Sequence, residues 1–190
     1  MEKERCKWVT SDEIYIKYHD DEWGRPIHDD EKFFEMLSLE GAQAGLSWLT
    51  ILKRRENYRV AFDHFNPKII SEYKDEKIAE LQLNEGIIRN KSKIKSVITN
   101  ARAFLTIQDE FGSFDNYIWQ FVGGSPINNN WKTDAHIPST TIQSEQMSKD
   151  LKKRGFKFVG PTICYAFMQA TGMVNDHTKE CFLYHEKIDS

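Results

Sequence analysis

The spacing of apolar residues along the chain predicts a series of helices. Apolar positions recur every three or four residues, as on one face of an α-helix. The clearest case is the segment 91–111, which Gly112 would end. Its apolar side carries Ile94, Val97, Ile98, Ala101 and Leu105. Further helices are predicted from Asp30 towards Gly45, from Trp48 to Phe62, from Pro67, from Asp75 to Leu81, over 114–122 (where a strand is the alternative), from Ser144 to Gly155 and from Pro161 to Ala170.

The segment 123–142, between the predicted helix over 114–122 and the one that starts at Ser144, has a different composition. Residues 123–142 contain two glycines, two prolines and three consecutive asparagines, and are predicted to form a loop without chemical groups of interest. No repeat or long flexible linker divides the 190 residues. The prediction is therefore an all-α protein with a single domain over 1–190.

Charge is unevenly distributed along the chain. The net charge is −3, which argues against a protein that coats nucleic acid by bulk charge alone. Residues 1–50 hold 12 acidic and 6 basic side chains, whereas the segments 86–108 and 151–175 hold only basic ones. These two segments are candidates for contact with anions.

No apolar stretch is long enough to span a membrane, and the first residues lack the apolar run of a secretory signal. We therefore expect a soluble cytoplasmic protein without membrane contact. The three cysteines cannot form a full set of disulfides. Cys164 lies in an apolar helix, where it is expected to pack as a small hydrophobic residue.

The basic segment 152–154 ends one predicted helix, and a short connection leads to the next. The connection runs from Gly155 to Gly160, with Pro161 at the first turn of the second helix. Free backbone N–H groups in such a hairpin can bind a phosphate without reading bases. The alternative is an ordinary helical corner whose basic side chains face solvent.

Cysteine and histidine occur in pairs near both ends of the chain. Cys6 and His19 lie near the N-terminus, and His177 and Cys181 have the i, i+4 spacing of one helical turn. Two thiolates and two imidazoles suit a closed tetrahedral zinc site, which would join the chain ends. The spacing matches no zinc finger, so free thiols and surface histidines remain the alternative.

Glu40 falls in line with the apolar positions of its predicted helix. A buried carboxylate needs a positive or hydrogen-bonding partner, so a cationic ligand is one possibility and a rim position beside an arginine is the other. Three of the five tryptophans, Trp8, Trp23 and Trp48, occur in the first 50 residues, as does Tyr18. Aromatic faces beside a carboxylate could hold a flat cation, although core packing would explain each aromatic residue singly.

Taken together, these segments resemble the bacterial DNA-3-methyladenine glycosylase I family over nearly the whole chain. The resemblance rests on the sequence segments RCKWV at 5–9, YHDDEWGRP at 18–26, FEMLSLEGAQAGLSWLTILKRRENYR at 34–59, GIIRNKSKI at 86–94, KKRGFKFVGPTICYAFMQATG at 152–172 and VNDH at 174–177. The resemblance implies an all-helical helix-hairpin-helix fold and excision of N3-methyladenine from alkylated DNA, with one structural zinc ion.

The resemblance also assigns roles to particular residues. It implies that Glu40 recognises the base and that double-stranded alkylated DNA is the substrate, with free 3-methyladenine as the product of a bacterial, nucleoid-associated monomer. The implied base pocket comprises Tyr18 and Trp48, with Trp8 and Trp23 close by. The implied zinc ligands are Cys6, His19, His177 and Cys181. Contacts with DNA are expected at Gly155, Lys157, Gly160 and Thr162.

Two positions depart from the wider helix-hairpin-helix superfamily. Asn175 stands where many members have an essential aspartate, and Phe158 replaces one hairpin glycine. No lysine occupies an identifiable Schiff-base position, so lyase activity is not expected. Leu46, after Gly45, is expected to fill the gap left by a flipped base, as apolar wedges do in proteins that bend DNA.

Two other functional classes remain open from the sequence. A non-catalytic DNA-binding module would need the hairpin but not Glu40 and its tryptophans. A zinc hydrolase would need an open coordination position, which two cysteines and two histidines do not leave.

Overall fold

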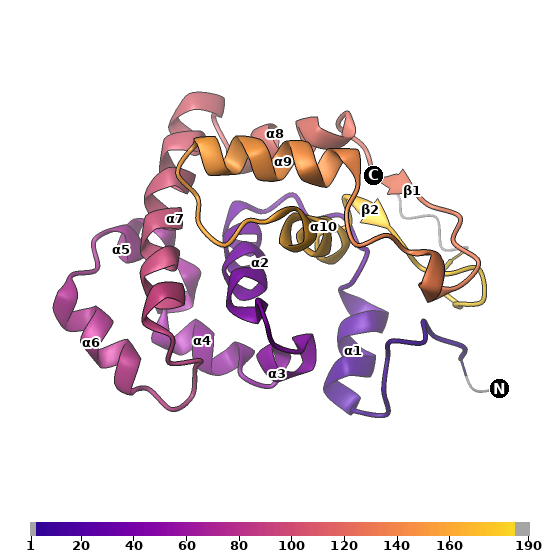
Figure 1. Ribbon diagram of the computed structural model, residues 1–190, viewed down its shortest axis with the longest axis horizontal. Helices are drawn as coiled ribbons and strands as arrows, with labels where there is room; N and C mark the ends of the chain where they lie inside the picture. Colours follow the sequence, from indigo (N-terminus) through magenta and orange to yellow (C-terminus); the bar gives the residue numbers. More distant parts are fainter. Residues whose placement is uncertain (1–2, 185–190) are drawn as a thin grey trace.

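The computed structural model describes residues 3–184, and helices dominate it (Figure 1). The α-helices are α1 (Glu13–Asp21), α2 (Asp30–Gln43), α3 (Trp48–Leu52), α4 (Arg55–Ala61), α5 (Pro67–Ser71), α6 (Asp75–Leu83), α7 (Lys91–Phe111), α8 (Phe114–Ile118), α9 (Ile142–Lys153) and α10 (Pro161–Ala170). Three 3-10 turns, η1 (Asp63–Phe65), η2 (Trp119–Val122) and η3 (Asp134–His136), accompany them. The helical prediction is thus confirmed.

Helix α2 lies at the centre of the molecule because it is apolar around most of its circumference. Ten of its residues are buried, including Phe33, Phe34, Leu37 and Leu39. It packs against α3, α7, α8 and α10, and Figure 1 shows it enclosed between them. The Asp29 side chain caps its N-terminus by accepting a hydrogen bond from the Lys32 backbone N–H. Glu40, near the C-terminal end of α2, is therefore held inside the protein.

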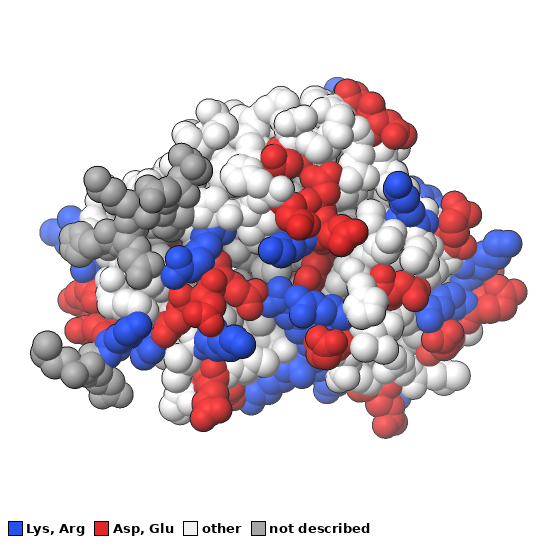
Figure 2. All heavy atoms as spheres, turned by 180° about the vertical axis from the view of Figure 1, so that it is seen from behind, with Lys and Arg blue, Asp and Glu red and all other residues white. Residues whose placement is uncertain are grey.

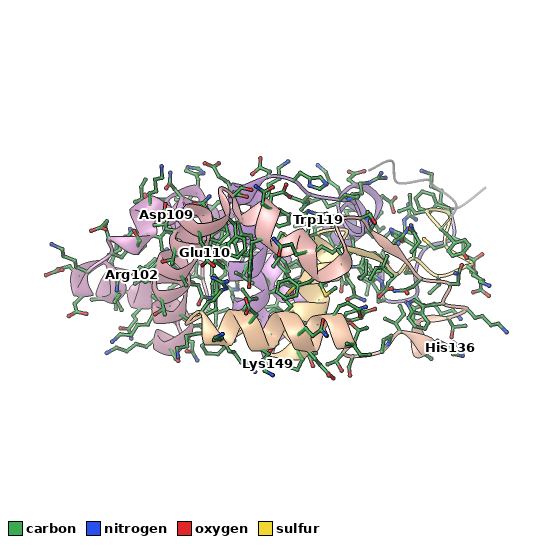
Figure 3. The ribbon with its side chains drawn as sticks, turned by 90° about the horizontal axis from the view of Figure 1, so that it is seen from above. Arg102, Asp109, Glu110, Trp119, His136 and Lys149 are labelled. Carbon is green, nitrogen blue, oxygen red and sulfur yellow. The ribbon has the colours of Figure 1, made fainter. Side chains whose placement is uncertain are left out.

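Several predicted boundaries agree with the structure to the residue. Helix α7 spans the predicted 91–111 and ends at Gly112, whose φ of +83° is the left-handed conformation that favours glycine. Helix α10 also has the predicted bounds. Figure 3 shows α9 along one edge of the molecule, with Lys149 on it, and η3 with His136 at the end far from α7.

The single helix predicted from Trp48 to Phe62 is wrong, because the segment divides into α3 and α4 around Lys53 and Arg54. Arg54 donates a hydrogen bond to the Glu85 carbonyl oxygen, and Arg55 binds Glu35. These contacts between distant parts of the chain fix a bend that the local pattern of apolar residues does not encode.

The fold is not wholly helical. Strand β1 (Ile127–Asn128) pairs in parallel with β2 (Val174–Asn175), with Ile127 opposite Val174. This pair ties the predicted loop 123–142 to the segment after α10. Gly172 is required between α10 and β2, since its φ is +69° and a Cβ there would lie 2.1 Å from the Arg25 carbonyl carbon.

Within the described part of the chain, no helix has the length and apolar character needed to cross a lipid bilayer.

Candidate functional site

Glu40 is the acidic side chain that α2 carries into the protein. The residue is only 3% exposed, and no group in residues 3–184 donates a hydrogen bond to its carboxyl oxygens. Burial raises the pKa of this carboxyl to about 8. An acidic group kept without a partner in the interior is a feature typical of ligand sites.

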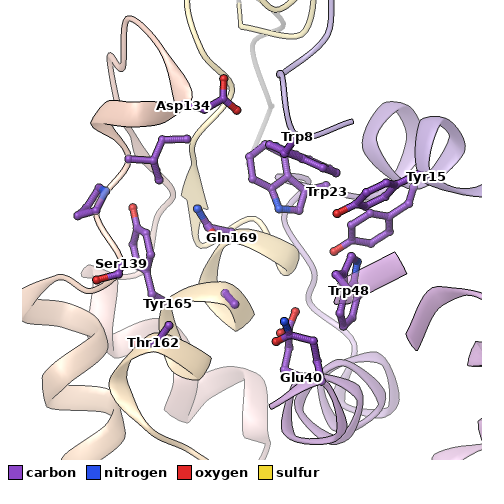
Figure 4. Close-up of a pocket in the computed structure, with 15 residues that line it drawn as sticks. Trp8, Tyr15, Trp23, Glu40, Trp48, Asp134, Ser139, Thr162, Tyr165 and Gln169 are labelled. Carbon is purple, nitrogen blue, oxygen red and sulfur yellow. The ribbon is translucent and has the colours of Figure 1, made fainter. Parts of the chain in front are cut away.

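Glu40 faces a pocket of about 400 Å³ that is walled on one side by aromatic rings (Figure 4). The rings are those of Trp8, Tyr15, Tyr18, Trp23 and Trp48. The Tyr18 and Trp48 ring centroids are 5.5 Å apart, and those of Trp8 and Trp23 are 5.0 Å apart. The structure thus brings Glu40 together with the four aromatic residues singled out from the sequence.

One atom of this wall is left without a hydrogen-bond partner. The indole Nε1 of Trp48 is buried and donates to no group in the described part of the chain. A buried donor of this kind normally finds a partner. A ligand with an acceptor atom would supply one.

The opposite wall of the pocket was missed by the sequence analysis. Helix α10 contributes Thr162, Tyr165, Ala166 and Gln169, and the predicted loop contributes Asp134, Ile137, Pro138 and Ser139. The prediction that residues 123–142 carry nothing of functional interest is therefore wrong, as four of them line the pocket. A loop longer than about 15 residues in a compact domain was the available signal, because such loops are usually functional.

The four cysteine and histidine residues from the chain ends meet in one buried cluster. Their ligand atoms all lie within 4.8 Å of one another. The Cys181 Sγ lies 3.5 Å from His19 Nε2 and 3.6 Å from His177 Nδ1, and the Cys6 Sγ lies 3.7 Å from His177 Nδ1. Tetrahedral zinc with bonds of about 2.3 Å to sulfur and about 2.0 Å to nitrogen separates the two kinds of ligand by roughly 3.6 Å. The cluster could hold such an ion.

The remaining nitrogen of each histidine ring also suits a metal site. The Nδ1 of His19 lies 2.8 Å from an Asp20 oxygen, and the Nε2 of His177 lies 3.2 Å from the Trp23 carbonyl oxygen. Metal-binding histidines usually donate their second ring N–H to such groups, which fixes the ligating tautomer. The residues present therefore fit a four-coordinate ion.

The backbone between His177 and Cys181 is not the helical turn expected from their spacing. A turn in which the Cys181 N–H bonds to the Thr178 carbonyl oxygen brings the two side chains together instead. Cys164 is fully buried, as predicted for a small core residue.

The connection between α9 and α10 is held from behind by α7. The Asn100 side chain donates to the Lys157 carbonyl oxygen at 3.0 Å and accepts from the Lys157 N–H at 2.7 Å. Phe158 has a φ of +54°, the left-handed conformation for which glycine is usual. The Lys157 side chain is exposed beside an open groove of about 370 Å³ that also contains Lys95 and Ser92 of α7.

Leu46 projects from the turn that follows α2. It is 38% exposed, and Gly45 before it has a φ of +78°. The Lys93 ammonium group donates to the Ala42 and Ala44 carbonyl oxygens at 2.8 and 2.6 Å, which secures the C-terminus of α2. The structure thus places Leu46 on the surface, in the turn after α2, and Glu40 inside, on the last turns of α2.

Neither side chain of the Asn175–Asp176 pair lines the pocket. Asn175 accepts a hydrogen bond from the His177 N–H and donates to Asn128. Asp176 is fully buried behind the wall formed by α10. The segment that supplies an acid in the wider superfamily therefore supplies none to this pocket.

The comparisons with known sequences agree with these features. The methyladenine glycosylase family matches residues 8–184. The DNA-3-methyladenine glycosylase 1 of Escherichia coli strain K12 is 50% identical over 181 residues, which cover 95% of this chain and 97% of that protein. The DNA-3-methyladenine glycosylase of Haemophilus influenzae is 47% identical over 93% of this chain and 96% of that one.

Solved structures give the same result for the fold. A crystal structure of 3-methyladenine DNA glycosylase I matches with a TM-score of 0.92 and 51% identity, over 94% of this chain and 98% of that one. The Staphylococcus aureus enzyme, described in terms of its 3-methyladenine recognition, matches with a TM-score of 0.91 and 36% identity, over 93% and 94% of the two chains. The chain therefore belongs to the methyladenine glycosylase family.

Proposed function

We propose that this protein removes N3-methyladenine from alkylated double-stranded DNA by hydrolysing the N-glycosidic bond, as the first step of base excision repair. The observation that carries the proposal is Glu40, a buried carboxyl without a partner in an aromatic pocket of about 400 Å³. The names of relatives that match over more than nine tenths of the chain support the same reaction.

The pocket suits a base that has left the DNA stack. A base inside a duplex is out of reach, so the nucleotide must be extruded. Methylation at N3 makes the adenine cationic, and a carboxylate and aromatic faces both favour a flat cation. In this proposal Glu40 accepts hydrogen bonds from the edge of the base while Tyr18 and Trp48 contact its faces.

The positive charge on the base also makes it a good leaving group. The N-glycosidic bond breaks and its electron pair stays with the base, which leaves as neutral 3-methyladenine. A water oxygen bonds to the anomeric carbon, and the proton that this water loses passes to solvent. The protein needs no strong general acid for these steps. Glu40 and the aromatic residues around it act by binding the positively charged base.

We propose that DNA is held by the α9–α10 connection and by the neighbouring surface of α7, as a helix-hairpin-helix motif. Backbone N–H groups at Gly155 and Gly160 with the Lys157 and Thr162 side chains would contact phosphates, and Lys95 would extend the contact along the groove. Leu46 would fill the gap in the stack. With so few phosphate contacts, affinity should be modest and should fall with salt by the shallow slope that a few contacts give.

We further propose that the cluster of Cys6, His19, His177 and Cys181 holds one zinc ion with a structural role. Two thiolates and two imidazoles leave no coordination position for water, so the ion would stabilise the fold by joining the chain ends. We also propose that the protein acts as a monomer.

Strand cleavage is not part of this proposal. Within the described residues, no lysine lines the pocket that contains Glu40, so no amine is available there for a Schiff base. The enzyme should leave an intact strand with an abasic site.

The test is incubation of the purified protein with methylated duplex DNA, with and without a metal chelator, followed by chromatography of the released bases. We expect release of 3-methyladenine without strand nicking. A brief treatment with chelator that leaves the buried zinc ion in place should not change this release. Failure to release any methylated base would refute the proposal. Strand cleavage at the site would refute its monofunctional part.

A further inference from the structure

Asp176 is a buried acid that the proposed reaction has not used. The residue follows β2 and has no exposed surface, and no ion pair to it exists within residues 3–184. A buried carboxylate without a cation is costly unless hydrogen bonds satisfy it. Its Oδ1 accepts from Asn129 Nδ2 and Trp131 Nε1, each at 2.7 Å, and its Oδ2 accepts from the Tyr165 hydroxyl at 2.6 Å and Gln169 Nε2 at 2.8 Å.

These four donors belong to the two elements that build the pocket wall opposite Glu40. Tyr165 and Gln169 project from α10 into the pocket (Figure 4). Asn129 and Trp131 follow β1 in the loop 123–142, whose residues 134 and 137–139 line the same pocket. Asp176 therefore joins the loop to the helix from behind, without touching the pocket itself.

The hydrogen bond to Asp176 also determines which end of the Gln169 amide remains available. The side-chain nitrogen Nε2 donates to the carboxylate, and no described group donates a hydrogen bond to the side-chain oxygen Oε1. An amide fixed in this way presents an acceptor on its other side. The pocket then has an acceptor on each of two facing walls, at Glu40 and at Gln169.

We propose that Asp176 is a positioning residue, an inference that rests on the proposed function. Asp176 holds the side-chain oxygen Oε1 of Gln169 towards the positively charged nucleotide, on the side of the pocket away from Glu40. Positive charge passes from the base to the sugar as the glycosidic bond breaks, so an oriented dipole on the second wall stabilises the transition state more than the bound base. Asp176 does not attack the sugar, because each of its oxygens already accepts two hydrogen bonds and it lies outside the pocket.

The substitution Asp176→Asn gives a specific prediction. The Trp131 indole can only donate, so the new amide must keep its oxygen on that side and turn its NH₂ towards Tyr165 and Gln169. The Gln169 side chain must then rotate so that its oxygen accepts from the new amide at position 176. This rotation turns the Gln169 NH₂ towards the cationic nucleotide in the pocket. We expect the single-turnover rate of methyladenine release to fall about tenfold, with a smaller change in affinity for free 3-methyladenine.

Two further variants separate this role from simple support of the fold. Gln169→Leu keeps Asp176 but removes the acceptor, and should lower the single-turnover rate to a similar extent. The double variant Asp176→Asn with Gln169→Glu exchanges the two groups, so that the new amide donates to the new carboxylate and an oxygen again faces the pocket. We expect this double variant to recover most of the lost rate.

Gln120→Leu is the matched control, because Gln120 is an exposed glutamine of η2 whose side chain bonds only to the Asn116 carbonyl oxygen. It should release base at the unmodified rate. Metal content, melting temperature and the indole N–H resonance of Trp131 are to be measured for each variant. If Asp176→Asn fails to fold, Gln169→Leu decides the matter.

Wild-type rates in a folded Gln169→Leu variant would overturn the inference. A folded double variant that stays as slow as Asp176→Asn would also overturn it. Neither result affects the proposed function, provided that the unmodified protein releases methyladenine and Glu40→Gln releases it at least tenfold more slowly. Absence of release by the unmodified protein would instead refute the function itself.

Discussion

At the scale of single residues, Glu40 combines two opposed physical effects. Burial in an apolar helix raises the pKa of its carboxyl to about 8, so the empty pocket holds it neutral at pH 7. A cation in the pocket would favour the ionised form. The position of Glu40 on the apolar face could be inferred from its spacing, whereas its lack of any partner could not, since that depends on what α10 and the loop present across the pocket.

The raised pKa implies a pH-dependent cost in stability. Between the ordinary value of 4.5 and about 8, the folded state binds more protons at Glu40 than the unfolded state does, so stability falls as pH rises through this range. Glu40→Gln removes this dependence. We expect the variant to be more stable than the unmodified protein by roughly 4–5 kcal/mol at pH 8.5, with the difference vanishing below pH 4.5. Urea unfolding at several pH values measures it, and a pH-independent difference would contradict the assignment.

The same carboxyl should shape the pH profile of activity. If the ionised form recognises a cationic base, kcat/KM on methylated DNA should rise with pH up to about 8 and then level off, because this ratio reports groups of the free enzyme. The Glu40→Gln variant should lack this rise. A profile that is flat from pH 6.5 to 8.5 in the unmodified enzyme would show that ionisation of Glu40 plays no part.

At the scale of elements, the hairpin between α9 and α10 depends on a residue outside the motif. The bounds of α10 were predictable from Pro161 and the apolar spacing, whereas the predicted helix 144–155 starts and ends two residues later than α9. The clamp by Asn100 was not, because one asparagine within a long amphipathic helix gives no sign of its distant partner. The left-handed backbone of Phe158 is likewise visible only in the structure, where its Cβ lies 3.5 Å from the position of a Cβ built on Gly41, next to Glu40.

Removing this clamp should affect DNA binding more than base recognition. Asn100→Ala eliminates both hydrogen bonds to Lys157 and frees the hairpin backbone. We expect affinity for duplex DNA to fall by about three- to tenfold while binding of free 3-methyladenine is unchanged. Thr106→Ala on the same helix is the control, because that hydroxyl bonds only to the Arg102 carbonyl oxygen. Equal losses for both ligands would indicate general damage to the fold.

At the scale of the whole molecule, long-range contacts organise both the chain ends and the charge. The face in Figure 2 carries interspersed acidic and basic side chains, with no large area of one sign. Within the basic segments, Arg154 is paired with Glu110 and Asp150, whereas Lys152, Lys153 and Lys157 are exposed without an ion pair among the described residues. The sequence indicated where positive charge gathers, but only the structure separates charges that are neutralised from those available to DNA.

The buried cluster of two cysteines and two histidines, the proposed zinc site, provides a test at this scale. Cys181→Ser removes a thiolate from a site in which His177 and both chain ends take part, so zinc content should fall and the melting temperature should drop by several degrees. Cys164→Ala is the matched control, as that thiol is buried away from the cluster and should leave zinc content unchanged. A Cys181→Ser protein that retains one ion and full thermal stability would exclude the structural role.

The most direct test of the central claim is single-turnover release of 3-methyladenine from a duplex that contains one such base, by the unmodified protein and by Glu40→Gln at equal metal content. We expect the variant to bind the duplex normally but to release base about 10- to 100-fold more slowly, since a hydrogen bond to a charged group is lost. Glu31→Gln, an exposed position on the same helix, should retain the full rate. Equal rates for Glu40→Gln and the unmodified protein would show that Glu40 does not recognise the base.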